Sequence, residues 1–214
     1  MSTTLSAPIS PPPVASAPRR RPVTRAEYER LIDLGFFGPD ERLELIEGEI
    51  IEKMTQSSRH ATEIRRFETA LRPIFGEGFD LRTQLPLALG ERSMPEPDLA
   101  VVTGSFEDYE DAHPTTAVLV IEISDSTLAQ DRTVKAGLYA SAGIAEFWLM
   151  NVAERLLEVL RDPAALAGQP SGHHYRQITR LGEDDTVSPL AAPQAVVALA
   201  DLLPRRGPRS GLPV

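Results

Sequence analysis

The chain contains no cysteine among its 214 residues, which excludes disulfide bonds and thiolate metal sites. Any metal ion must therefore be bound by oxygen or imidazole groups, and magnesium or manganese suits such ligands best. Long apolar runs are missing as well, because stretches such as 118–121 are far shorter than a membrane span. Residues 1–21 also lack the apolar core of a signal peptide. We therefore expect a cytoplasmic protein with no membrane contact.

Positive charge is scarce in this chain. Its 22 Lys and Arg residues are outnumbered by 31 Asp and Glu residues, which gives a net charge of -9 at pH 7. This balance does not favour nucleic-acid binding, because non-specific affinity comes mainly from Lys and Arg that neutralise phosphates. A local basic surface could still form around four arginines in the first half of the chain, which are Arg65, Arg66, Arg72 and Arg82.

The two ends of the chain differ in composition from its middle. The first 22 residues carry six prolines, which are Pro8, Pro11, Pro12, Pro13, Pro18 and Pro22. Because such a segment cannot bury a core, we expect a disordered tail over 1–23, a single domain over 24–203 and a flexible tail over 204–214. The arginine run 19–21 is typical of a solvated charge cluster, although it could also contact phosphate.

Two helices are expected in the first third of the domain. Thr24 can cap a helix that ends at Gly35. Ser57 or Ser58 begins a second helix, in which apolar residues recur at helical spacing until Pro73 ends it. The second helix is amphipathic, so we expect it to pack on a sheet.

The remaining pattern predicts strands and a third helix. Strand signals occur at 43–51, as a hairpin around Glu47 and Gly48, and at 81–89, 98–102, 117–124 and 146–151. A helix is expected over 128–141, closed by Gly143. Segments 155–160 and 175–179 alternate like an added antiparallel pair. Together these elements predict an α/β fold with a mixed central sheet flanked by helices, in which segment 117–123 is a central, covered strand.

Two carboxylates stand out against this apolar sheet. Glu122 lies within the apolar run 118–124, where a carboxylate is costly unless it is paired or bound to a metal, although a strand-end glutamate can also reach solvent. Asp98 follows Pro97 at the start of another apolar strand, a position that is also common in ordinary turns. If the two strands are neighbours, the two carboxylates form a site for a hard divalent cation.

Three further residues are candidates for this site. Lys135 lies on the helix after the Glu122 strand, and its spacing from Asp131 is that of an exposed i,i+4 ion pair. The helix could instead fold back over the strand end and direct the ammonium group toward the carboxylates. His60 in the first turn of the second helix and Glu47 in the hairpin are weaker candidates. The other histidines, His113, His173 and His174, lack metal-ligand spacing.

Five stretches occur in the order found in one known family: 42–50, 57–60, 95–102, 119–127 and 131–149. The segment from Glu122-Ile123-Ser124-Asp125-Ser126-Thr127 through Lys135 to Phe147-Trp148 is the most specific of them. These residues resemble the Uma-type restriction endonucleases, a branch of the PD-(D/E)XK nuclease superfamily. The resemblance extends over about residues 24–203, which is nearly all of the chain outside the tails.

The resemblance implies a restriction-endonuclease-like core with an added N-terminal helix and hairpin and extra antiparallel C-terminal strands. It implies metal ligation by Asp98, Glu122 and the backbone carbonyl of Ile123, with Mg²⁺ or Mn²⁺ as the cation. In the superfamily the catalytic lysine stands two residues after the glutamate, where this chain has Ser124. The resemblance therefore implies that Lys135 on the following helix takes that place.

The implied activity is hydrolysis of phosphodiester bonds in DNA by a metal-activated water. A homodimer would suit the cutting of both strands. The acidic net charge supports two alternatives: a catalytically silent binding or assembly protein with a nuclease fold, and a phosphodiesterase that acts on RNA or small nucleotides.

Overall fold

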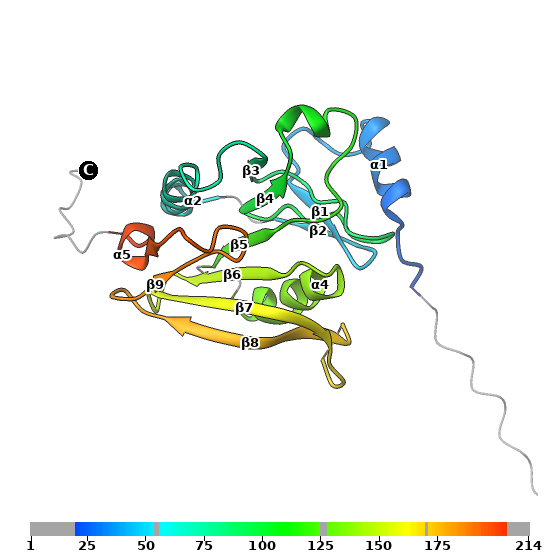
Figure 1. Ribbon diagram of the computed structural model, residues 1–214. Coiled ribbons are helices and arrows are strands. Elements are labelled where there is room, and N and C mark those ends of the chain that lie inside the picture. The colour runs from blue at the N-terminus through cyan, green and yellow to red at the C-terminus, as the bar shows by residue number, and fades with distance from the viewer. Residues whose placement is uncertain (1–19, 54–55, 125–127, 170, 205–214) are drawn as a thin grey trace, which may run out of the picture.

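The computed structural model describes residues 20–53, 56–124, 128–169 and 171–204. Its central sheet has six strands: β3 (Phe79–Thr83), β4 (Leu99–Thr103), β5 (Leu119–Ser124), β6 (Glu146–Asn151), β7 (Leu156–Ala165) and β8 (His173–Leu181). They are hydrogen-bonded in chain order from β3 to β8 (Figure 1). Only β5 and β6 form a parallel pair in this sheet, and the other neighbours are antiparallel. The predicted mixed α/β fold is confirmed.

Helices cover both faces of this sheet (Figure 1). On one face, α2 (Ser58–Leu71) and α5 (Leu199–Leu202) form an apolar core that includes Ile121 of β5. On the other face, α4 (Ala136–Ser141) packs in a second core that includes Val120. Successive residues of β5 alternate between these cores, and all six are buried. β5 is therefore the covered central strand that its sequence predicts.

The predicted third helix is an unbroken helical segment with an irregular middle. It comprises α3 (Leu128–Gln130), the π-helical turn η2 (Asp131–Lys135) and α4. The backbone N–H of Ala136 donates to the Asp131 carbonyl five residues earlier, as a π turn requires. The sequence predicts the limits of this segment, 128–141, but not the π turn. Such turns occur mostly as single widened turns and are frequent at functional sites.

The N-terminal helix begins at a capping box. α1 spans Arg25–Asp33, the Thr24 side chain accepts a hydrogen bond from the Glu27 backbone, and the Glu27 carboxylate binds the Thr24 backbone N–H in return. Gly35 follows with φ +64°, a left-handed conformation that suits glycine and ends the helix. The sequence therefore predicts both ends of α1 from local chemistry.

The predicted hairpin is formed by β1 (Leu43–Ile46) and β2 (Glu49–Glu52). Its two turn residues, Glu47 and Gly48, both have positive φ, which matches the right-handed twist of the strands. The hairpin is attached to the rest of the domain where Leu45 pairs with Met94.

Several elements differ from the sequence prediction. The strand expected over 81–89 is β3, which begins earlier and ends at Thr83, because Gln84 has φ +51° and leaves the extended conformation. β7 and β8 are longer than the predicted pair. Four short elements were not predicted: η1 (Phe106–Tyr109), β9 (Thr186–Val187), β10 (Val197–Ala198) and α5. Elements this short carry too few residues for a periodic signal.

Most of the two predicted tails, residues 1–19 and 205–214, lies outside the described residues, as do 125–127 of one family-like stretch. None of the helices in the described ranges has the length and apolar character needed to cross a membrane.

Candidate active site

The pairing of β4 with β5 brings the two predicted carboxylates together. Leu99 lies opposite Ile121 in this antiparallel pair, so one further step in the same register places Asp98 opposite Glu122. Both side chains are buried, with exposures of 6% for Asp98 and 4% for Glu122. Because side chains alternate along a strand, Glu122 lies toward the face covered by α4, whereas Asp98, just before β4, contacts His60 of α2.

Three groups hold the Asp98 carboxylate. His60 on α2 lies with Nε2 2.9 Å from Oδ1, and the backbone N–H of Ile123 donates to Oδ2 at 2.8 Å. Gln84 donates from Nε2 at 3.4 Å. Although burial raises the pKa of Asp98, His60 and the Ile123 N–H outweigh it and lower the pKa. The same hydrogen bond raises the pKa of His60, so the pair is a carboxylate facing a basic imidazole.

Glu122 is bound by two groups of the helical segment. Lys135 Nζ donates to Oε1 at 2.9 Å, and Tyr139 Oη donates to the same oxygen at 2.7 Å. The pKa of Glu122 is raised to about 7, mainly by burial. The nearby carboxylates Asp98, Asp131 and Glu44 raise it further, whereas Lys135 lowers it. Glu122 is therefore a buried carboxylate with more negative than positive charge around it.

Lys135 is buried, with an exposure of 5%, and is not on the helix surface as its spacing allowed. Its Nζ lies 2.9 Å from Glu122 and 3.4 Å from Glu44 Oε1. Burial lowers the pKa of Lys135, but Glu122, Glu44 and Asp131 outweigh it and raise the pKa. The lysine is therefore a fixed positive charge at the centre of the site.

The π turn and its anchors explain how two residues reach one carboxylate. Lys135 and Tyr139 are four residues apart, which places them on the same side of the helical segment. Arg132, in the same turn, donates from Nε and Nη2 to the buried Glu158 of β7 at 2.9 and 2.8 Å. This bidentate pair fixes the turn over the sheet. The turn therefore holds Lys135 above Glu122.

Glu44 of β1 belongs to the site and was not among the predicted candidates. It has an exposure of 3%, its Oε2 accepts a hydrogen bond from the Glu96 backbone at 3.2 Å, and its Oε1 faces Lys135. A signal for it exists, because Glu44 interrupts an apolar strand just as Glu122 does. The predicted Glu47 lies instead exposed in the hairpin turn, where its backbone N–H donates to Ser93 Oγ. The structure does not bring Glu47 to this cluster.

Gln84 and Tyr139 were also missed. Gln84 lies beside Asp98 with a positive φ, which is uncommon for a residue with a side chain and occurs at active sites as well as in turns. Tyr139 is fully buried between the helical segment and the sheet, so its sequence position looks like that of a core aromatic. Neither residue has a local pattern that distinguishes it from ordinary ones.

The donor set suits a hard cation. Asp98 and Glu122 offer carboxylate oxygens, and the Ile123 N–H points toward Asp98. In an extended strand the N–H and C=O of one residue point to the same neighbour, so the Ile123 carbonyl faces the same side. Four carboxylates surround one lysine here, which are Glu44, Asp98, Glu122 and Asp131. A divalent cation would balance this excess of negative charge.

Within the described ranges, no three His, Cys, Asp or Glu side chains are grouped as a metal site. The candidate set is compatible with this finding because it consists of two carboxylates and one backbone carbonyl. In the described arrangement His60 and Lys135 neutralise the two carboxylates instead.

Comparison with known proteins places the chain in a family. A crystal structure described as a "putative nuclease belonging to DUF820" from Anabaena variabilis is 18% identical and has a TM-score of 0.57. The match covers 85% of this chain and 97% of that chain, and it indicates a shared fold. No match was found among curated proteins. Residues 25–200 match Uma2, described as "putative restriction endonuclease", and the chain belongs to the Uma2 family.

Proposed function

We propose that this protein is a Mg²⁺- or Mn²⁺-dependent endonuclease that hydrolyses phosphodiester bonds in DNA. The observation that carries the proposal is the buried cluster in which Lys135 lies 2.9 Å from Glu122 while Asp98 stands opposite Glu122 across two paired strands. Such a cluster costs free energy, because four carboxylates and one lysine are removed from water together, and clusters of this kind are frequent at functional sites. Membership of the Uma2 family supports a nucleic-acid substrate.

Asp98, Glu122 and the Ile123 carbonyl would hold the cation. When bound, it would supply Lewis-acid activation of the phosphate and of the attacking water. Lys135 would place a positive charge beside the phosphate as negative charge develops on it. His60 binds Asp98 through Nε2, so its Nδ1 would be the nitrogen that accepts or donates a proton or positions a water. Glu44 and Tyr139 would keep Lys135 and Glu122 in place.

Cleavage assays with purified variants test this proposal. We expect metal-dependent cleavage of DNA by the wild type, and a loss of about 100-fold or more in Asp98→Asn, Glu122→Gln and Lys135→Ala, as for removal of a group that stabilises a transition state. Glu47→Gln is the matched control, because it neutralises an exposed carboxylate outside the cluster. Circular dichroism of each variant checks that it is folded. Cleavage by the three cluster variants at the same rate as by Glu47→Gln and the wild type would refute the proposal.

Metal binding separates this proposal from a catalytically silent nuclease fold. A ligand that binds the folded state raises the melting temperature by mass action. We expect Mn²⁺ to stabilise the wild type and Glu47→Gln, but not Asp98→Asn. The same cleavage assay with RNA and with small cyclic nucleotides tests the other alternative, in which the substrate is not DNA.

A further inference from the structure

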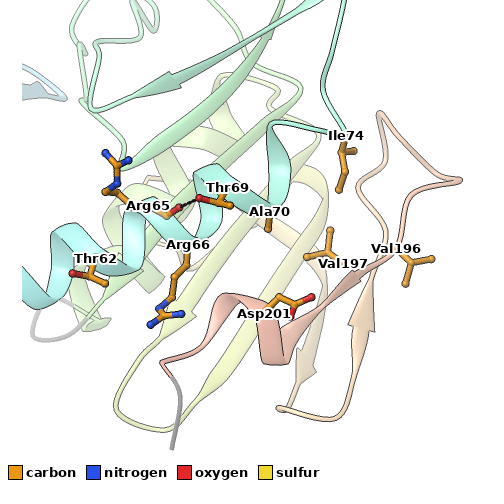
Figure 2. Close-up of a pocket in the computed structure, with 9 residues that line it drawn as sticks. All are labelled: Thr62, Arg65, Arg66, Thr69, Ala70, Ile74, Val196, Val197 and Asp201. Carbon is orange, nitrogen blue, oxygen red and sulfur yellow. Dashed lines mark hydrogen bonds between the residues drawn. The ribbon is translucent and has the colours of Figure 1, made fainter. Parts of the chain in front are cut away.

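A pocket of about 660 Å³ lies beside α2, away from the carboxylate cluster. Figure 2 shows its lining, which comes from α2, the loop after it, β10 with the residue before it, and α5: Thr62, Arg65, Arg66, Thr69, Ala70, Ile74, Val196, Val197 and Asp201. None of the candidate active-site residues lines it. Its volume lies within the range of about 300–1,000 Å³ that is usual for small-molecule sites.

The arginines of α2, together with Arg72 at its C-cap, divide into two classes. Arg59 binds Glu63 and Arg72 binds Glu68, each as an i,i+4 ion pair. Arg65 and Arg66, by contrast, have no carboxylate partner among the residues that the structure describes, and both line the pocket. In a chain with a net charge of -9, two adjacent unpaired arginines at a pocket are unusual.

Arg66 also has a polar atom without a partner inside the protein. Its Nε–H is buried and donates no hydrogen bond within the described residues. A buried donor that lacks a partner is unfavourable, so it is a signal for a ligand or an ordered water. Figure 2 shows the Arg66 side chain extending from α2 toward α5, whereas Arg65 extends to the other side of the helix. Arg66 is therefore the residue best placed to bind an anionic group of a ligand in this pocket.

The rest of the pocket wall is largely aliphatic. Ala70, Ile74 and Val197 form it together with Val196, whose side chain is 68% exposed. The hydroxyl groups of Thr62 and Thr69 donate to carbonyls of their own helix. A ligand that fills this pocket therefore needs an anionic group for Arg66 and a flat or apolar group for the aliphatic wall.

We propose that this pocket binds one nucleotide unit, with its phosphate on the Arg66 guanidinium and its base or sugar against the aliphatic wall. The guanidinium is the side chain best suited to phosphate, because its donors form a planar fork. The nucleotide is either part of the nucleic-acid strand that reaches the active site or a free nucleotide. If the nucleotide belongs to a strand, the inference rests on the proposed function. Binding of a free nucleotide is independent of catalysis.

The position of α2 favours a nucleic-acid strand over a free nucleotide. His60, in the first turn of the helix, contacts Asp98 of the active site, and Arg66 lies six residues further along. Six helical residues span about 9 Å. A nucleic acid bound at the carboxylate cluster could therefore continue along α2 to the pocket. Asp201 is an acidic residue at the pocket, is exposed, and has no bond to Arg66 in Figure 2.

Binding in EDTA tests the inference without catalysis. The probes are inorganic phosphate, dTMP, a single-stranded oligonucleotide and a duplex. We expect Arg66→Gln to weaken binding about tenfold, which is about 1.4 kcal/mol, and to reduce the slope of log Kd against log salt by about 1. Arg72→Gln, on the same helix and with the same loss of charge, should match the wild type. An effect on dTMP alone identifies a free nucleotide, and an effect on the oligonucleotides identifies the strand.

Asp201→Asn provides a second test at an exposed position. It removes a negative charge from the pocket, so we expect tighter binding of the same probes. Equal Kd values for the wild type and Arg66→Gln with every probe would overturn the inference, as would equal weakening by Arg66→Gln and Arg72→Gln. Cleavage by Asp98→Asn and the wild type reports on the proposed function separately. A protein that binds through Arg66 but does not cleave supports the pocket and not the nuclease.

Discussion

The raised pKa of Glu122 leads to a testable dependence of stability on pH. The pKa is about 7 in the folded protein and 4.5 for an unperturbed glutamate, because the folded state buries the carboxylate beside three others. Between these two values the folded state therefore binds more protons than the unfolded state. Linkage then requires the free energy of unfolding to fall as the pH rises from 4.5 to about 7.

The size of the effect follows from the same two values. The difference between 4.5 and about 7 corresponds to about 3 kcal/mol of unfolding free energy. Glu122→Gln removes the titrating group and keeps its shape. We therefore expect the wild type to lose about 3 kcal/mol more than the variant between about pH 4.5 and pH 8. Glu122→Gln also removes the ion pair of Lys135, which changes the stability of the variant at every pH. Only the two pH slopes are therefore compared.

Urea denaturation in EDTA, followed by circular dichroism at several pH values, measures these slopes. Glu47→Gln is the control and should keep the wild-type slope, because Glu47 is exposed in its turn. Addition of Mn²⁺ should reduce this loss, because a bound cation favours the ionised carboxylate. Parallel curves for the wild type and Glu122→Gln would refute the argument that this carboxylate is buried in an excess of negative charge.

Three further substitutions test the structure, with urea denaturation as the measurement in each case. Tyr139→Phe removes the hydroxyl that donates to Glu122 at 2.7 Å, and should cost about 1–3 kcal/mol without loss of secondary structure. Phe67→Ala opens a cavity at a fully buried position between α2 and the sheet, and should cost about 3–5 kcal/mol. Thr24→Ala removes the cap that pairs with Glu27 and should cost about 1 kcal/mol, with cleavage unchanged. A larger cost for Thr24→Ala than for Phe67→Ala would contradict the assigned burial.

Local sequence patterns predicted much of the fold. The helical periods of α1, α2 and 128–141, the hairpin turn at Glu47 and Gly48, and the covered strand β5 depend on residues within a few positions of each other. Such features are encoded locally, because capping, turn conformation and the alternation of buried side chains act over one or two turns. The candidate pair of Asp98 and Glu122 follows from the same reasoning, since each lies in an apolar strand.

Failures of prediction occurred where local signals were weak. Strand 81–89 was predicted as one continuous element, but the conformation of Gln84 ends β3 and turns its side chain to Asp98. β9 and β10 have two residues each, and α5 has four. Their pairing and packing depend on partners that are distant in the chain, so no short window of sequence can reveal them.

The sequence by itself determined the fold class and the central strand, and it singled out the two carboxylates as candidates. Only the tertiary structure decided what surrounds them. Lys135 has the spacing of a surface residue. The π turn and its anchor on Glu158 nevertheless place it against Glu122, which lies 13 residues earlier in the chain. Glu44 meets it there from β1. The physical reason is that a buried charge is fixed by its partners, and these partners are brought together by the packing of elements far apart in sequence.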